Sequence, residues 1–198
     1  MKIIFLGIDN KEDLVTWLNN IGEDVIYCNH KIDLDFVKME SPDYIISYNY
    51  HHILKKDIIN YMGDKIINLH ISYLPFNGGT YPNLWSFVEG TTSGVTIHNL
   101  VEEVDGGDIL LQEKIIFGEY ETLNSSYQKS HNLIKELFKQ NWNDIKNQKI
   151  VSKKQNGKGT FHYDKDYRKY LEPIILDYGW DISIKDFKSK YREFNDIT

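Results

Sequence analysis

The sequence predicts an α/β fold, with a Rossmann-like, mostly parallel sheet covered by helices on both faces. Short continuous apolar runs alternate with helical patterns through the first half of its 198 residues. Such runs are typical of strands buried on both faces of a parallel sheet. The hydrophobic content of 41% and aromatic content of 14% are those of a folded domain with a real core. We expect one catalytic domain over residues 1–150 and a short C-terminal appendage over residues 151–198.

The expected strands are short apolar runs bounded by polar or turn residues. In chain order they lie at residues 2–7, 23–28, 43–47, 65–68, 93–100 and 108–116. A helix carrying Leu14, Trp17 and Leu18 on one side joins the first two strands. Further helices are expected through residues 53–59, over residues 82–90, and from an N-cap at Thr122 to about Trp142. Residues 147–159 are polar and predict a loop.

Three polar side chains are expected at one edge of this sheet, where ligands bind beyond the carboxyl ends of the strands. Asn68 ends a predicted strand, and His70 lies two residues later on the same side of an extended segment. Asp105 lies in the acidic turn between the last two predicted strands. Taken alone, each has another interpretation, because a single histidine is often satisfied by backbone partners and Asp-Gly is a common turn pair.

Other candidate residues have competing interpretations. His98 lies inside an apolar strand, so we interpret it as structural. Trp85, Tyr81 and Tyr73 are either core aromatics or a stacking surface for a base. The two glutamates at 102–103 are interpreted as a solvated loop.

Bulk properties exclude several classes of function. A formal charge of −6 argues against a protein that contacts many phosphates of a nucleic acid. No apolar run has membrane-spanning length, and the first residues lack a signal-peptide pattern. The single cysteine, Cys28, forms neither a disulfide framework nor a metal site by itself. No G-x-G-x-x-G follows Gly7, so a dinucleotide cofactor is not supported. We expect a cytoplasmic protein without a metal, a nucleic-acid partner or a membrane partner.

Residues 43–113 resemble the folate-dependent formyltransferases, whose formyl-transfer domain is shared by glycinamide ribonucleotide and methionyl-tRNA formyltransferases. The motifs that carry the resemblance are Asn68-Leu-His70, Ser72-Tyr-Leu-Pro75, Gly79-Thr-Tyr-Pro82, Gly94-Val-Thr-Ile-His98 and Asp105-Gly-Gly-Asp108. The similarity is greatest to the sugar N-formyltransferases. Their Gly-Thr-x-His segment resembles the run from Gly159 to Asp166.

The resemblance implies that Asn68, His70 and Asp105 are catalytic and that N10-formyltetrahydrofolate is the formyl donor. Asn68 and protonated His70 would donate hydrogen bonds to the formyl oxygen, while Asp105 would hold His70 or a bridging water. The cofactor is expected near Tyr50, His51, His52, Ile53 and Leu54, and against Val101, Glu102, Val104 and Asp105. Substrate contacts are expected from Ser72, Asn77, Gly78, Gly79, Tyr81 and Trp85.

The expected acceptor is the amine of a dTDP-linked amino-deoxysugar, specifically dTDP-4-amino-4,6-dideoxyglucose. Many relatives carry an arginine after the Leu-Pro step, but residues 76–79 contain none. Phosphate binding is therefore expected from backbone N–H groups, from Asn77 or from a basic residue elsewhere. The family also leads us to expect a homodimer formed through the C-terminal appendage.

Alternative functions remain open at this point. A methionyl-tRNA formyltransferase is expected to carry a larger, basic C-terminal domain, and a formyltetrahydrofolate hydrolase an extra N-terminal domain. Size does not exclude a glycinamide ribonucleotide formyltransferase. A non-catalytic folate-binding or nucleotide-sugar-binding relative is disfavoured because Asn68, His70 and Asp105 are all present.

Overall fold

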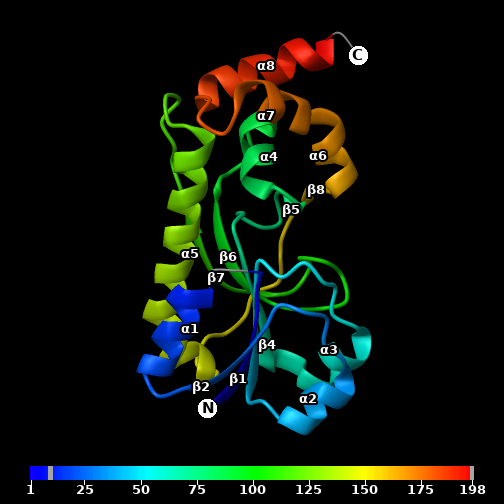
Figure 1. Ribbon diagram of the computed structural model, residues 1–198, viewed down its shortest axis with the longest axis vertical. Coiled ribbons are helices and arrows are strands. Elements are labelled where there is room, and N and C mark those ends of the chain that lie inside the picture. Colours follow the sequence, from blue (N-terminus) through cyan, green and yellow to red (C-terminus); the bar gives the residue numbers. More distant parts are fainter. Residues whose placement is uncertain (9–10, 197–198) are drawn as a thin grey trace. The chain divides into compact units, whose positions relative to one another are not determined.

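The computed structural model describes residues 1–8 and 11–196 (Figure 1). The chain divides into two compact units, each made of three separate stretches. The first unit comprises Met1–His70, Ile97–Leu111 and Phe138–Gln155, and the second comprises Ile71–Thr96, Gln112–Leu137 and Asn156–Thr198. The division at residue 150 into a catalytic domain and an appendage stays a prediction.

The first unit is built on a six-stranded sheet with the order β2-β1-β3-β4-β6-β7. Strand β1 pairs in parallel with β2 and β3, and β3 pairs in parallel with β4. The predicted Rossmann-like, mostly parallel sheet is therefore confirmed. Its strands are β1 (Lys2–Leu6), β2 (Asp24–Cys28), β3 (Tyr44–Tyr48), β4 (Ile66–His70), β6 (Gly94–Asn99) and β7 (Ile109–Lys114), the last two of which also run through the second unit.

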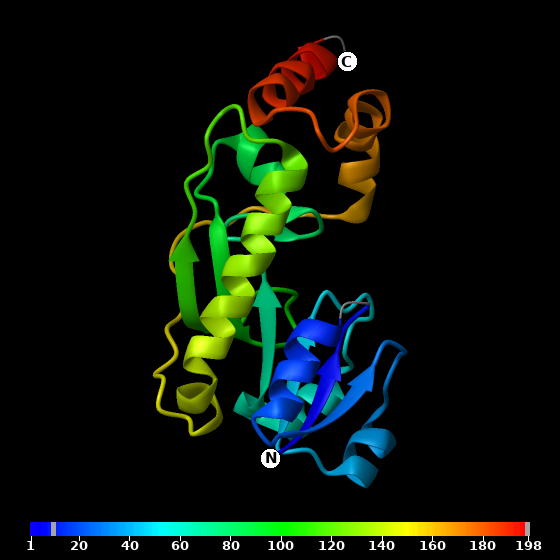
Figure 2. The same cartoon turned by 60° about the vertical axis from the view of Figure 1, so that its left-hand side comes forward.

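Helices cover both faces of this sheet (Figure 2). On one face, Ile4 packs in a buried cluster with Val37 and Ile58 of two helices. On the other face, the ring of Tyr44 meets the edge of Trp142, with centroids 5.6 Å apart. The covering elements are α1 (Lys11–Asn20), α2 (Leu34–Glu40), α3 (Lys56–Met62), the 3-10 turn η1 (Gly63–Lys65) and the C-terminal part of α5 (Leu123–Lys146).

The second unit is mainly helical. Its core contains Leu84, Leu171 and Phe187, all fully buried. A two-stranded parallel ladder joins β5 (Gly78–Gly79) to β8 (Phe161–His162). The helices are α4 (Pro82–Glu89), α6 (Asp164–Tyr170), α7 (Glu172–Tyr178), α8 (Ile184–Asp196) and the first part of α5. No helix in the described part of the chain is long and apolar enough to cross a bilayer.

Some boundaries differ from the sequence-based prediction for clear physical reasons. Strand β4 extends to His70 because Leu69 continues the parallel pairing with Tyr48. Helix α5 continues to Lys146, since its apolar side carries Ile145 into the core. Sequence analysis did not predict α2, whose first turn is capped by the Asp33 carboxylate accepting from the backbone N–H of Phe36. It also did not predict β5 or β8.

Candidate active site

Strand β4 and the loop between β6 and β7 position the three predicted catalytic side chains. Because alternate residues of a strand face opposite sides, Asn68 and His70 share one side, and Leu69 is buried on the other. Asp105 has a positive φ of 55°, in the left-handed region that non-glycine residues rarely adopt. Gly107 is required nearby, because a Cβ there would lie 1.7 Å from the carbonyl oxygen of Asn99.

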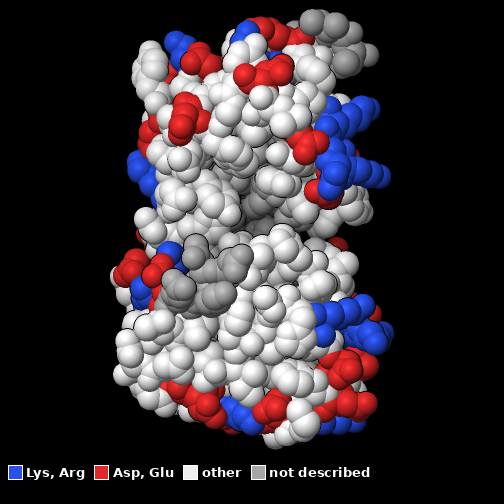
Figure 3. Space-filling view, viewed as in Figure 1, with Lys and Arg blue, Asp and Glu red and all other residues white. Residues whose placement is uncertain are grey.

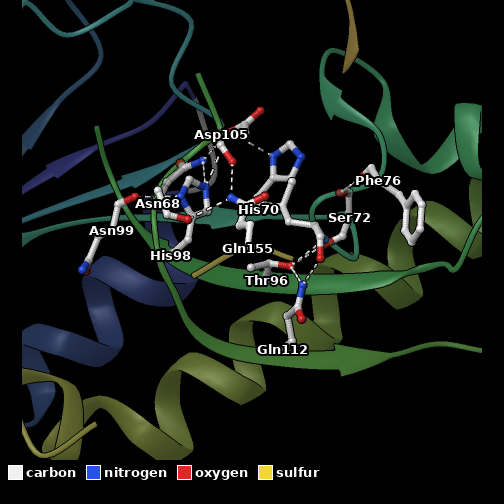
Figure 4. Close-up of polar contacts among 12 residues, drawn as sticks. Asn68, His70, Ser72, Phe76, Thr96, His98, Asn99, Asp105, Gln112 and Gln155 are labelled. Carbon is white, nitrogen blue, oxygen red and sulfur yellow. Dashed lines mark hydrogen bonds and ion pairs between the residues drawn. The ribbon is translucent and has the colours of Figure 1, made fainter. Parts of the chain in front are cut away.

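The structure brings Asn68, His70 and Asp105 together around one carboxylate oxygen (Figure 4). Asp105 Oδ1 lies 3.4 Å from Asn68 Nδ2 and 3.7 Å from His70 Nδ1. The side chains of His70 and Asp105 are each only 10% exposed. Water screens these groups weakly at such burial, so their electrostatic interaction is stronger than at the surface.

His98 joins this set as a fourth member. Its Nε2 lies 3.6 Å from Asp105 Oδ1 and 3.3 Å from Asn68 Nδ2. Its Nδ1 lies 2.8 Å from the carbonyl oxygen of Asn99, which can only accept, so Nδ1 carries a hydrogen. In the neutral ring Nε2 is then an acceptor, and the Asn68 amide N–H donates to it. His98 is buried, as a structural histidine would be, but it also orients the amide of Asn68.

Gln155 fixes the backbone of the loop that carries Asp105. Its Nε2 donates to the carbonyl oxygens of Asp105, at 2.6 Å, and of Gly107, at 2.8 Å. Two backbone hydrogen bonds between Ile109 and Lys153, of 2.7 and 2.8 Å, hold the neighbouring segment beside the start of β7. Sequence analysis missed this residue, because a glutamine in a polar loop carries no periodic or motif signal.

The predicted cofactor residues lie in two segments of the first unit. Lys56 Nζ lies 2.8 Å from Glu102 Oε1, which places the start of α3 beside the loop after β6. Three apolar side chains on these segments are exposed: Ile53 at 75%, Val101 at 37% and Val104 at 45%.

The other predicted cofactor residues differ in exposure. The Tyr50 hydroxyl donates to the carbonyl of His30, and its ring meets His52 edge-on. His51 is exposed, whereas Leu54 belongs to the buried core. Contact of any of these residues with a folate stays a prediction.

In the second unit, the predicted phosphate contact Asn77 is wholly buried and engaged by the protein. Its Nδ2 donates to Glu89 Oε2 at 2.9 Å, and its Oδ1 accepts from Thr91 Oγ1 at 2.6 Å. The Ser72 hydroxyl likewise donates within the chain, to the carbonyl of Phe76. In this structure, therefore, the amide of Asn77 is occupied by protein partners.

The other predicted substrate residues form a packing framework in the same unit. The ring of Trp85 is 3% exposed and stacks on His162, with centroids 3.9 Å apart and an interplanar angle of 8°. Tyr81 stacks on Tyr167 at 3.6 Å. Gly78 and Gly79 form β5, and a Cβ on Gly79 would lie 2.1 Å from the carbonyl oxygen of His162. Direct substrate contact by these residues stays a prediction.

Among the described residues, no group of three or more His, Cys, Asp or Glu side chains is arranged to hold a metal ion. The site offers one amide, two imidazoles and one carboxylate. Such groups can stabilise a developing oxyanion and transfer protons. On an α/β fold, these groups suit an enzyme that catalyses acyl transfer.

Comparison with known proteins identifies the family. A model of the formyl transferase family matches residues 29–141, which is more than half of the chain. The chain is 37% identical to the formyltransferase PseJ from Anoxybacillus kamchatkensis, solved in complex with UDP-4,6-dideoxy-4-formamido-L-AltNAc and tetrahydrofolate. That likeness covers 94% of this chain and 97% of PseJ, with a TM-score of 0.88. The chain belongs to the formyl transferase family.

Two further relatives agree with this assignment. A 4-N formyltransferase from Francisella tularensis is 27% identical, with a TM-score of 0.73 over 85% of this chain and 79% of that one. The bifunctional polymyxin resistance protein ArnA of Wigglesworthia glossinidia brevipalpis is 37% identical over 97 residues. That match spans 48% of this chain but only 15% of ArnA.

Proposed function

We propose that this protein transfers the formyl group of N10-formyltetrahydrofolate to the amine of a nucleotide-linked amino-deoxysugar. One observation carries the proposal: Asn68 Nδ2 and His70 Nδ1 lie 3.4 and 3.7 Å from the same carboxylate oxygen, Oδ1 of Asp105. The likeness to PseJ over 94% of the chain supports it. The tetrahydrofolate in the PseJ complex supports a folate as the formyl carrier.

The reaction requires charge stabilisation and a balanced proton transfer. The neutral amine attacks the formyl carbon, a C–N bond forms, and negative charge develops on the formyl oxygen. Collapse of this intermediate breaks the bond to folate N10, so that the amine nitrogen loses one proton and N10 gains one. His70 can donate to the oxygen and move this proton directly or through water. The Asp105 carboxylate, 3.7 Å away, favours positive charge on the ring.

Asn68 would supply a second donor to the formyl oxygen. Both hydrogens on its Nδ2 face protein partners, namely His98 at 3.3 Å and Asp105 at 3.4 Å. The contact with Asp105 is long for a hydrogen bond and is therefore weak. Exchanging it for a shorter bond to the oxyanion costs little, while His98 continues to hold the amide in place. With this exchange, the hydrogen bonds of Asn68 in this structure are compatible with a role in stabilising the intermediate.

The relatives favour an amine at position 4 of the sugar. PseJ was solved with a UDP-linked 4-formamido sugar, and the Francisella relative is described as a 4-N formyltransferase. We therefore propose a UDP-linked 4-amino-4,6-dideoxy sugar as the first acceptor to test. The dTDP-4-amino-4,6-dideoxyglucose suggested by the family resemblance is the second.

A direct assay tests the proposal. The protein is incubated with N10-formyltetrahydrofolate and a panel of UDP-linked and dTDP-linked amino sugars, with glycinamide ribonucleotide included as a competing acceptor. Mass spectrometry should detect the gain of one formyl group on a 4-amino sugar. Formylation of glycinamide ribonucleotide with no product from any sugar would show that the proposed acceptor class is wrong.

A further inference from the structure

The segment from Gly159 to Lys165 belongs to a family-like motif, yet the chemistry proposed above gives it no role. Its side chains alternate in environment, as expected for extended backbone. Thr160 and His162 are partly buried, whereas Phe161 and Tyr163 are exposed by 40% and 59%. Thr160 and His162 can therefore contact the rest of the second unit, whereas Phe161 and Tyr163 are available to a ligand.

The inward set anchors the segment. Thr160 Oγ1 accepts a hydrogen bond from the backbone N–H of Asn77 at 2.9 Å. His162 Nε2 lies 2.9 Å from Glu89 Oε1, and its ring stacks on buried Trp85. These contacts fix the backbone of β8 within the unit. The positions of the exposed side chains of Phe161 and Tyr163 are therefore well defined.

The outward set combines aromatic faces with positive charge. The rings of Phe161 and Tyr163 are 5.0 Å apart, at an interplanar angle of 65°. Lys165 Nζ lies 5.2 Å from the centroid of the Tyr163 ring. In Figure 3, Lys and Arg side chains gather over α6, the helix that carries Lys165, Arg168 and Lys169. We refer to Phe161, Tyr163 and Lys165 as the recognition edge.

We propose that the recognition edge binds the nucleoside diphosphate of the sugar substrate, an inference that rests on the function proposed above. Because the two rings are inclined by 65°, the base would stack on one of them and meet the edge of the other, and the diphosphate would lie at Lys165. Such stacking is tolerant of base identity because every base has a π-face. A lysine ammonium is a compact point charge that suits phosphate oxygens.

Two observations favour a nucleoside diphosphate over other occupants. The arginine that many relatives carry after the Leu-Pro step is missing, and the amide of Asn77 is occupied by Glu89 and Thr91. Of the phosphate contacts expected from the sequence, backbone N–H groups and a basic residue elsewhere in the chain then remain. The cations Lys165, Arg168 and Lys169 of α6 outnumber the carboxylates of Asp164 and Asp166, so this helix offers net positive charge to a diphosphate beside two exposed rings.

Binding of UDP and of dTDP, measured by calorimetry without folate, tests this inference separately from formyl transfer. Whichever of Phe161→Ala and Tyr163→Ala removes the stacking ring should weaken binding by about 5- to 150-fold, the range for loss of one base-stacking ring, and the other should weaken it less. Tyr163→Phe, which keeps the ring, should bind like the wild type. Lys165→Ala should weaken binding and reduce its dependence on salt.

The chain contains a matched control pair. Tyr120 is 79% exposed, and Lys185 Nζ lies 5.4 Å from its ring centroid, so the pair has the same chemistry at another position. Tyr120→Ala and Lys185→Ala should leave nucleotide affinity unchanged. Equal losses in the control pair and in the recognition edge would overturn the inference, because the effect would then be nonspecific.

The outcomes separate this inference from the proposed function. If the wild-type protein formylates a nucleotide sugar while Phe161→Ala and Tyr163→Ala bind UDP and dTDP as tightly as it does, the recognition edge is wrong and the function stands. If the wild type neither binds these nucleotides nor formylates any nucleotide sugar, both are wrong. Circular dichroism of each variant verifies that a loss of binding is not a loss of folding.

Discussion

Removing the side-chain donor of Gln155 should lower turnover without unfolding the protein. Gln155→Met keeps the length of the side chain but deletes the bonds to the carbonyls of Asp105 and Gly107, which are 2.6 and 2.8 Å long. Each neutral bond contributes about 0.5–1.5 kcal/mol, so the pair contributes about 1–3 kcal/mol. Holding Asp105 at a φ of 55° costs about 1–2 kcal/mol. The two bonds are therefore large enough to offset the strain in this loop.

The assay is steady-state formyl transfer with both substrates varied. If Gln155 acts by positioning Asp105, kcat should fall by up to about 5- to 150-fold, the equivalent of 1–3 kcal/mol. The KM for the sugar nucleotide should change little. Lys154→Met is the matched control, since this neighbour is 86% exposed and its Nζ lies 3.3 Å from the Asp108 carboxylate. A Gln155→Met enzyme with wild-type kcat and pH profile would show that the loop holds Asp105 unaided.

Three further predictions concern turnover and stability. His70→Asn should lower kcat by about 10²–10³, the cost of one oxyanion donor, with folding retained in circular dichroism; near-wild-type turnover would contradict the mechanism. Burial alone would raise the pKa of Glu23, but hydrogen bonds from Lys146, the amino terminus and Trp142 outweigh it and lower the pKa from 4.5 to about 2. Glu23 therefore adds about 3 kcal/mol of stability that is present above pH 4.5 and lost as the pH falls toward 2, and urea titrations of Glu23→Gln should lack this acid dependence. Burial, helped by the charge of Lys135, lowers the pKa of His131 from 6.5 to about 4. As the pH decreases from 6.5 to 4, the unfolded chain takes up a proton before the folded protein does, so the free energy of unfolding should fall over this range. His131→Gln should remove this pH dependence of stability.

The positions of catalytic candidates on strands and turns could be predicted from local sequence patterns. The two-residue spacing of Asn68 and His70 on a strand was enough to place both side chains on one side. The Asp-Gly-Gly turn at Asp105 could be located because it interrupts two apolar runs. The family resemblance then selected the catalytic interpretation over the structural ones.

Contacts between distant residues could not be predicted in the same way. Gln155 reaches a loop 50 residues earlier in the chain, and His162 stacks on Trp85 across 77 residues, so neither contact has a periodic signal. Asn77 was one of three possible phosphate contacts, and the sequence alone did not show that Glu89 and Thr91 bind its side-chain amide. Such pairings depend on how separate segments pack, and one sequence does not encode that packing in any local pattern.

If the proposed function is right, formyl transfer from the folate to a sugar amine depends on the group around Asp105. The most direct test follows tetrahydrofolate release and formylated sugar together, using N10-formyltetrahydrofolate and a UDP-linked 4-amino-4,6-dideoxy sugar, for the wild type and for Asp105→Asn. We predict one tetrahydrofolate released per sugar formylated by the wild type, and loss of both products in the variant with its fold retained. Equal turnover by Asp105→Asn, or tetrahydrofolate release without any formylated sugar, would contradict the account.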